Sequence, residues 1–187
     1  EKVLQEISDV FNPARQMLVS VVAGVSIDQL AEWTGHREEE PAVFRVIPNT
    51  AACVGKSMTF LSAAHADEEQ IETVKALFDT VGSTMVVDEK MLETGMILAS
   101  CGIAFALRYI RAAAEGGVEL GCKAAQATEI VARTLIGAGE LLLQNGTHPE
   151  QEIDRVTTAG GITIRGLNEM EHAGFTSAVI RGLKACK

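Results

Sequence analysis

The pattern of residue types along the chain changes near residue 90, and no other sequence feature constrains the fold as strongly. Before that point short β-branched runs alternate with helical spacing, whereas beyond it Ala is frequent and β-branched runs vanish. Alternation of strand and helix is typical of an α/β layer, and an unbroken series of helices is typical of an all-α domain. We therefore predict an α/β segment over residues 1–89, followed by an all-α domain over residues 90–187.

Local patterns predict the elements of the first segment. Ser26 is expected to cap a helix, and negative charge from Asp67 onward favours the N-terminus of another, which Gly82 is expected to end. Helices are thus predicted over 2–11, 26–33 and 68–81. Strands are predicted over 17–23, 43–47, 58–63 and 85–87, the first of them buried on both faces.

The second segment is predicted to be helical throughout, with its breaks at glycines. The stretch Met96–Leu107 carries no charge, and a helix that is apolar on every side must be buried. Because so small a domain offers little core, we expect these helices to form a homodimer, with a larger homo-oligomer left open. The predicted helices cover 91–114, 123–144, 150–156, 162–172 and 176–185, and the predicted breaks are Gly116–Gly117, Gly146, Gly160–Gly161 and Gly174.

Composition excludes several classes of partner. Acidic residues number 25 against 16 Lys and Arg, for a formal net charge of −9, which argues against nucleic acid and anionic lipid because both need clustered cations. The apolar run Met96–Leu107 is shorter than a membrane span and no signal peptide opens the chain, so we expect a cytoplasmic protein without membrane contact. The four cysteines are scattered, and no metal site is expected.

Three segments resemble functional motifs only in part. Gly55-Lys56-Ser57 ends like a phosphate-binding loop, but an earlier glycine is missing and a strand is predicted to follow. Gly137-Ala138-Gly139 begins like a dinucleotide fingerprint, but it lies within a predicted helix, where close helix packing is the better explanation. Glu169 and His172 form one Glu-x-x-His pair, whereas a di-iron bundle needs two, so a solvated helix face is favoured.

The segment Thr157–Thr163 retains a functional interpretation. Its glycines, Gly160 and Gly161, directly precede a predicted helix, so the unpaired N–H groups of that helix would be open to a carboxylate or phosphate. The hydroxyls of Thr158 and Thr163 add donors and acceptors. An ordinary N-cap that joins two helices is the alternative, and spacing alone favours it slightly.

A second candidate is the polar turn Arg45–Thr50, which follows a predicted strand. In α/β sheets, ligands bind beyond the carboxyl ends of the strands. An ordinary Pro-Asn turn explains the same residues equally well.

Together these segments resemble pyrroline-5-carboxylate reductase, the enzyme of the last step of proline synthesis. The family's S-P-G-G-T-T-I-x-G-L and L-E-x-x-G-F correspond to T-A-G-G-I-T-I-R-G-L over 158–167 and M-E-H-A-G-F over 170–175. Its R-V-M-P-N-T and V-S-x-x-A-G-V correspond to R-V-I-P-N-T over 45–50 and V-S-V-V-A-G-V over 19–25. The chain departs from the family at Ala51, Ile103 and Ala159, where the family carries proline.

The resemblance implies a fold and a reaction. The fold is the C-terminal part of a Rossmann-type nucleotide-binding domain, followed by an all-helical substrate-binding and dimerisation domain. The reaction is reduction of the small-molecule substrate 1-pyrroline-5-carboxylate to L-proline by NADPH or NADH. The family's opening strand and glycine-rich turn have no counterpart here, so we expect a fragment, with its own activity and its choice of cofactor left open.

The resemblance also implies which residues form the site. It places the Thr163 hydroxyl, as the catalytic group, at the ring nitrogen, and the backbone N–H groups of Ile162 and Thr163 at the carboxylate. The implied substrate-binding residues are Glu89, Arg155, Thr158, Gly160, Gly161, Ile162 and Thr163. The implied cofactor-binding residues are Val21, Val22, Ala23, Asn49 and Glu89.

Three of these assignments have ordinary structural alternatives. Val21 to Ala23 also fit a plain strand core, and Glu89 fits a charged residue at a strand-to-helix junction. Arg155 stands where many family members carry a polar neutral residue.

Two other functions stay open from the sequence. One is a non-catalytic helical oligomerisation module, and the other is another dehydrogenase of the β-hydroxyacid type.

Overall fold

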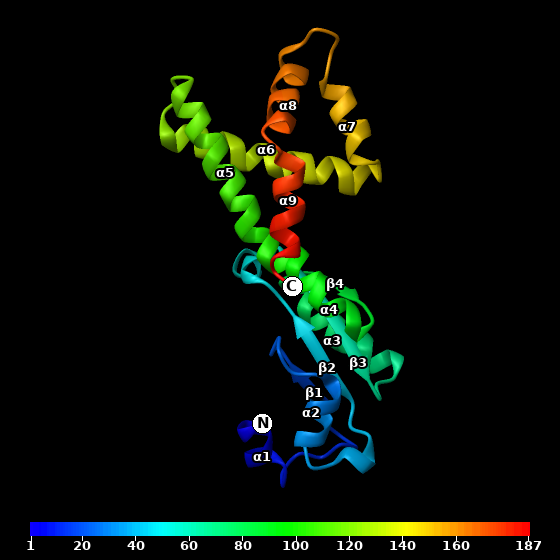
Figure 1. The fold of residues 1–187 in the computed structure, drawn as a ribbon. Helices are drawn as coiled ribbons and strands as arrows, with labels where there is room; N and C mark the ends of the chain where they lie inside the picture. The colour runs from blue at the N-terminus through cyan, green and yellow to red at the C-terminus, as the bar shows by residue number, and fades with distance from the viewer. The chain divides into compact units, whose positions relative to one another are not determined.

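The computed structural model describes all residues from Glu1 to Lys187, and the chain divides into two compact units, Glu1–Gly102 and Ile103–Lys187 (Figure 1). The domain boundary that we expected between residues 89 and 90 stays a prediction.

A four-stranded sheet forms the centre of the first unit. Its strands are β1 (Leu18–Ser20), β2 (Val43–Ile47), β3 (Ser57–Ala64) and β4 (Gly82–Val86), in the order β1-β2-β3-β4. β1 runs parallel to β2, β2 antiparallel to β3, and β3 parallel to β4. The sheet is therefore mixed, and the carboxyl ends of β1 and β2 lie at the same edge.

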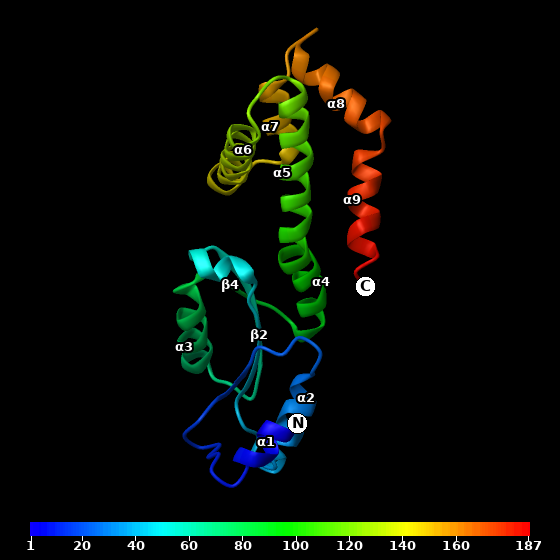
Figure 2. The same cartoon turned by 90° about the vertical axis from the view of Figure 1, so that its left-hand side faces the viewer.

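Helices cover both faces of this sheet (Figure 2). The helix α3 (Glu68–Asp79) packs on one face, where Val74 joins Phe44, Val46 and Leu61 in a buried cluster. On the other face, α2 (Ile27–Trp33) contributes Ile27, Leu30 and Ala31 to a second cluster with Val43. A short N-terminal helix, α1 (Lys2–Ile7), adds Leu4 to that cluster.

The helix α4 (Leu92–Met96) lies on the same face as α2, over β3. Its Gly95 is seated against the ring of Phe60, so closely that a Cβ at Gly95 would come within 2.8 Å of the ring. Leu92 is fully buried there. Three 3-10 turns complete the unit: η1 (Arg37–Glu39), η2 (Thr50–Val54) and η3 (Glu89–Met91).

Capping residues set the starts of two helices, as predicted for Ser26, whereas for Asp67 only a favourable negative charge was predicted. Ser26 accepts a hydrogen bond from the Gln29 N–H, and Asp67 accepts one from the Gln70 N–H, each within a reciprocal capping box. The third helix, however, ends at Asp79, and Gly82 begins β4 instead of closing the helix. The helix expected over 2–11 is shorter, ending at Ile7.

The strand expected over 17–23 is wrong in length and in burial. β1 ends at Ser20, and the side chains of Val21 and Val22 are 58% and 54% exposed. Within this chain β1 pairs on one side only, with β2. The backbone turns at Ala23–Gly24 instead of continuing the ladder.

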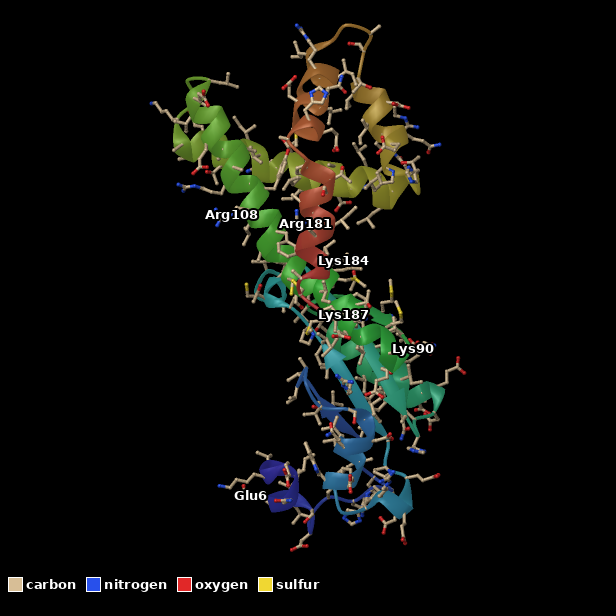
Figure 3. The ribbon with its side chains drawn as sticks, in the orientation of Figure 1. Glu6, Lys90, Arg108, Arg181, Lys184 and Lys187 are labelled. Carbon is tan, nitrogen blue, oxygen red and sulfur yellow. The ribbon has the colours of Figure 1, made fainter.

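The second unit is all helical, as predicted. It contains α5 (Gly102–Glu119, whose first residue belongs to the first unit), α6 (Ala124–Asn145), α7 (Pro149–Val156), α8 (Ile162–His172) and α9 (Phe175–Lys184). Rings of Tyr109 and Phe175 meet edge to face at 6.4 Å, which joins α5 to α9. Arg181 and Lys184 occupy the last turn of α9 (Figure 3), where positive charge complements the helix dipole.

The break expected at Gly116–Gly117 is wrong, because α5 continues through both glycines. A Cβ at Gly117 would lie 3.1 Å from the Cβ of Ala127, so the glycine allows α5 and α6 to approach closely. The chain turns instead after Gly121, whose φ is +95°.

One helical stretch carries unusual apolar surface. From Glu89 to Glu119 the chain is helical for 31 residues and, by length and composition alone, could cross a membrane. The expectation against a membrane span rested on the apolar run Met96–Leu107 alone, and the helix that contains this run is longer. Its first turns are nevertheless packed on the sheet through Leu92 and Gly95, and it includes a π-helical segment, η4 (Ile97–Cys101).

Candidate functional site

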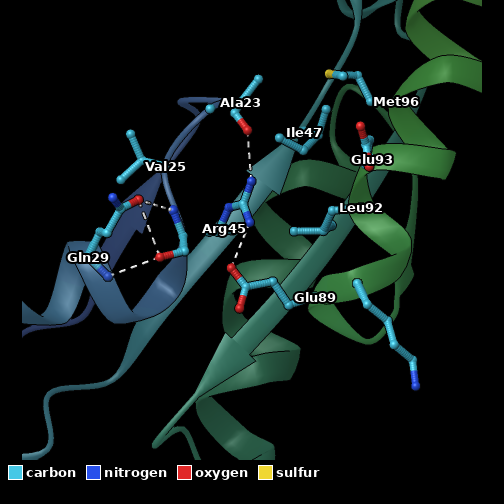
Figure 4. A pocket seen from close by; sticks show the side chains of 12 residues that line it. Ala23, Val25, Gln29, Arg45, Ile47, Glu89, Leu92, Glu93 and Met96 are labelled. Atoms are coloured by element: carbon cyan, nitrogen blue, oxygen red, sulfur yellow. Dashed lines mark hydrogen bonds and ion pairs between the residues drawn. The ribbon is translucent and has the colours of Figure 1, made fainter. Parts of the chain in front are cut away.

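A cleft of about 690 Å³ opens on the α2 face of the sheet, at the carboxyl ends of β1 and β2 (Figure 4). Side chains alternate between the faces of a strand, so Arg45 and Ile47 share the face on which Val43 packs against α2. The cleft is lined by Ala23, Gly24, Val25, Ser26, Gln29, Arg45, Ile47, Glu89, Lys90, Leu92, Glu93 and Met96.

Arg45 is the central polar residue of this cleft. One guanidinium nitrogen, Nη1, donates to Glu89 Oε1 at 2.6 Å, and the other, Nη2, donates to the carbonyl of Ala23 at 2.7 Å. The side chain is only 12% exposed, and its Nε is buried without a partner. Arg45 thus ties the turn after β1 to the segment that follows β4.

Glu89 is fixed from two sides. Besides the bond from Arg45, its Oε1 accepts the backbone N–H of Ile27, the first residue of α2, at 2.8 Å. The carboxylate therefore satisfies an open donor at the start of that helix. With 36% of its side chain exposed at the cleft, Glu89 is a junction residue and also a wall of the cleft. Its contact with substrate or cofactor stays a prediction.

Of the other predicted cofactor residues, some have exposed side chains and one has a side chain that is hydrogen-bonded within the protein. Val21 and Val22 are exposed beyond β1, and Ala23 lines the cleft. Asn49 caps η2: its Oδ1 accepts the Ala51 N–H at 2.9 Å and its Nδ2 donates to the Met58 carbonyl at 3.2 Å. The Asn49 N–H also donates to Ser57 Oγ at 3.1 Å, and its carbonyl accepts the Ala52 N–H at 3.1 Å. Asn49 is thus firmly held in the turn, and its contact with a cofactor stays a prediction.

The predicted substrate residues of the second unit, apart from Arg155, gather at the start of α8. The Gly161 N–H donates to the Thr158 carbonyl at 2.8 Å, closing a turn in which Gly160 has φ +69°. A Cβ at Gly161 would lie 2.5 Å from Thr158 Oγ1 and 2.9 Å from its carbonyl oxygen. The turn therefore needs glycine at both positions, for conformation at Gly160 and for space at Gly161.

No side chain caps α8, so the first N–H groups of this helix are left open. Thr163 is exposed, and Ile162 is 81% exposed. This arrangement is the bare helix end that the diglycine predicts, and it differs from α7, where His148 accepts the Glu150 N–H as a side-chain cap.

Arg155 lies outside this turn, near the end of α7. Its Nη1 donates to Glu152 Oε1 at 2.7 Å. Glu152 also accepts hydrogen bonds from Thr147 and Asn145, and the Thr147 bond is the main reason that the pKa of Glu152 is lowered. The guanidinium is thus already paired, and its role toward a substrate stays a prediction.

The partial motifs behave largely as expected. Gly55-Lys56-Ser57 leads into β3, a strand, and not into a helix. Glu169 and His172 form an exposed pair at 3.6 Å on the surface of α8. Gly137 and Gly139 do lie within α6, but a Cβ at either would meet nothing within 4 Å in this chain, so close packing within the chain does not explain them.

Sequence reasoning missed the role of Arg45 in joining the parts of the cleft. We had placed Arg45 in a strand-end turn, but not among the site residues. Its signal was a single charged residue within an apolar strand, Val43–Ile47, on the face that also carries Val43.

Comparison with known proteins gives a consistent assignment. Residues 89–187 match the family described as "Pyrroline-5-carboxylate reductase dimerisation". Pyrroline-5-carboxylate reductase 1 of Dictyostelium discoideum is 43% identical, with 89% of this chain and 32% of that protein aligned. Pyrroline-5-carboxylate reductase 2 of the same organism is 39% identical over 89% of this chain and 60% of its own length.

Solved structures show the same fold. A pyrroline-5-carboxylate reductase from Coxiella burnetii superposes with a TM-score of 0.91 at 24% identity, covering 99% of this chain and 68% of that one. The 1-pyrroline-5-carboxylate reductase of Streptococcus pyogenes gives 0.80 at 29% identity, covering 97% and 72%. The chain spans less than two thirds of the length of the curated relatives described above. On the match over residues 89–187, the chain belongs to the pyrroline-5-carboxylate reductase family.

Proposed function

We propose that this protein carries out the NADPH- or NADH-dependent reduction of 1-pyrroline-5-carboxylate to L-proline, in the cytoplasm. Membership of the family and the named relatives support the reaction class. The observation that carries the substrate assignment is the uncapped start of α8 behind Gly160 and Gly161. Such a helix end binds a carboxylate through its free N–H groups and its dipole.

The residues near β1 fit the nicotinamide end of the cofactor. Exposed Val21 and Val22 offer apolar surface beyond the carboxyl end of a parallel strand, where dinucleotides bind in such sheets. Ala23 borders a cleft whose volume is in the range of ligand sites. A reduced nicotinamide supplies, when bound, the hydride that is added to the C=N carbon.

In this proposal the chain's own groups bind and orient the imine. The N–H groups of Ile162 and Thr163 take the carboxylate, and the Thr163 hydroxyl lies at the ring nitrogen, where it steadies the N–H proton. Glu89 contacts substrate and cofactor from the cleft wall. Thr158 shapes the turn that holds the helix end open. Arg155 lies three residues before Thr158, at the end of α7. Positioning and fixed donors then supply most of the rate.

The proposal includes a homodimer through the C-terminal helices. Only Ala114 and Ala127 are buried in α5 to α9, while large apolar side chains on every one of these helices are exposed. A second copy would cover this surface, including that of the long helical stretch from Glu89 to Glu119. No nucleic-acid or membrane partner is part of the proposal.

The reaction is tested with protein expressed from its complete gene, by following oxidation of reduced cofactor with 1-pyrroline-5-carboxylate. Thr163→Ala is expected to lower kcat/KM about 100-fold, because the hydroxyl at the ring nitrogen is lost. Thr163→Ser keeps the hydroxyl and should retain most of the activity. Both variants should unfold like the wild type, since Thr163 is exposed.

The same assay separates the alternatives. Turnover of small 3-hydroxy or 2-oxo acids in place of the imine would indicate a dehydrogenase of the β-hydroxyacid type. A dimer without turnover of any of these substrates would indicate an oligomerisation module. Kinetics of Thr163→Ala equal to those of the wild type would contradict the assigned role of the helix end.

A further inference from the structure

We propose that Arg45 is a positioning residue of the reductase, acting through Glu89 and through the backbone at Ala23. This inference rests on the proposed function. Its basis is the pair of bonds from one guanidinium to the Ala23 carbonyl and to Glu89 Oε1, at 2.7 and 2.6 Å (Figure 4).

The two acceptors belong to parts of the chain that are distant in sequence. Ala23 follows β1, whereas Glu89 follows β4, the strand at the other end of the sheet order. Arg45 sits on β2, in register with Ser20 of β1 and Ser62 of β3. A side chain from the middle of the sheet thus sets the spacing between two walls of the cleft.

These two walls are the ones assigned to the cofactor. Residues 21–23 and Glu89 are the groups proposed to contact it, and Arg45 holds one member of each. The bond from Ile27 to the same oxygen, Oε1, fixes the carboxylate further. Arg45 touches neither reacting atoms nor cofactor in this proposal, and its contribution is the placement of groups that do.

Arginine suits this task better than lysine. Its planar fork presents two nitrogens to two acceptors at fixed angles, whereas an ammonium is a single point charge on a flexible stem. Arg45 is largely buried, so a lysine at this position would keep the positive charge but not the geometry. Arg45→Lys therefore separates the two contributions.

The test measures KM and kcat of Arg45→Lys, Glu89→Gln and the double variant, again with protein from the complete gene. We expect Arg45→Lys to raise the KM for reduced cofactor about 10-fold or more, because small misplacements of contact groups weaken productive binding strongly. The double variant should lose little more than Glu89→Gln alone, since residues that act through one another are not additive. Lys75→Met, which removes an ion pair with Asp79 on α3 at 2.7 Å, is the matched control and should leave both constants unchanged.

The outcomes distinguish this role from the proposed function. A wild-type protein without imine reduction overturns the proposed function, and the role of Arg45 with it. An active wild type whose Arg45→Lys variant keeps its KM, or loses kcat only in proportion to its unfolded fraction, overturns the role of Arg45 alone. A merely structural arginine would change the amount of folded enzyme but not the KM of the folded part.

Discussion

The contact between Gly95 and Phe60 gives a sharp test of how α4 is seated beside the cleft. In Gly95→Ala the new Cβ would lie 2.8 Å from three atoms of the Phe60 ring, whereas carbon atoms make their best contact at about 3.5–4.0 Å. The helix or the ring must therefore move by about 0.7 Å or more. Overpacking of this kind costs roughly 1–3 kcal/mol.

A second glycine in the same helical stretch supplies the control. Gly102→Ala places its Cβ 4.0 Å from the nearest atom, the carbonyl oxygen of Ile97, which is an ordinary contact. Both substitutions gain about 1 kcal/mol of helix propensity, so this gain cancels when the two variants are compared. We expect Gly95→Ala to be less stable than Gly102→Ala by about 1–3 kcal/mol.

The measurement uses the fluorescence of Trp33, the one tryptophan of the chain, which lies on α2 in the first unit. Urea unfolding followed at this residue reports the unit that contains Gly95 and Phe60. Adding Phe60→Leu to Gly95→Ala should relieve part of the clash, so the two substitutions should not be additive. Equal unfolding midpoints for Gly95→Ala and Gly102→Ala would refute the reasoning.

Two further predictions concern pH and assembly. The Ser8 carbonyl, which is hydrogen-bonded to His36 at 3.0 Å, and then the Glu39 carboxylate raise the pKa of His36 above its ordinary value. A raised pKa in the folded state means that the protonated histidine contributes stability at low pH, and that this is lost as pH rises through the folded-state pKa. As pH rises from about 5.5 to 8.5, the urea midpoint of the wild type should therefore fall relative to that of His36→Gln. Midpoints that change in parallel would contradict this. Light scattering of the complete protein should give twice the mass of one chain, and Ile136→Lys, on an exposed apolar face of α6, should reduce it. A monomeric wild type would reject the dimer.

Local signals were enough to predict much of the first unit. The apolar run Val43–Ile47 between polar turns specified β2 with its observed bounds. The capping signals of Ser26 and Asp67 fixed the starts of α2 and α3, because a side-chain acceptor at the N-cap satisfies a donor that otherwise stays open. Such signals act within four residues, so they are visible in sequence.

Interactions between distant residues were not predictable in this way. Arg45 and Glu89 lie 44 residues apart, and nothing local indicates that one guanidinium would reach both Glu89 and Ala23. The antiparallel pairing of β2 with β3 likewise depends on the path of the chain and not on the residues within either strand. The resemblance to a family predicted Glu89 as a site residue, and the structure shows what holds its side chain.

Glycines in the helical unit show why a single sequence pattern can have opposite outcomes. Gly116 and Gly117 do not end α5, because close contact between Gly117 and Ala127 favours a helix without a side chain there. Gly160 and Gly161 do lie in a break between two helices, in the turn that leads into α8, because Gly160 takes a positive φ and a Cβ at Gly161 would strike Thr158. Composition is the same in both pairs, and the difference lies in what surrounds them.

The same reasoning extends to glycines that touch nothing. Gly137, Gly139 and Gly166 leave open space where a Cβ would stand, although glycine costs an exposed helix about 1 kcal/mol each compared with alanine. No contact within the chain offsets this cost. Close approach of another backbone at those positions would offset it. Because the helices that carry these glycines, α6 and α8, also expose large apolar side chains such as Ile136 and Ile162, a second copy packed on them accounts for both features with one interface. The unpaired N–H groups of α8 then belong to a helix whose surroundings depend on assembly, which links the proposed carboxylate site to the dimer.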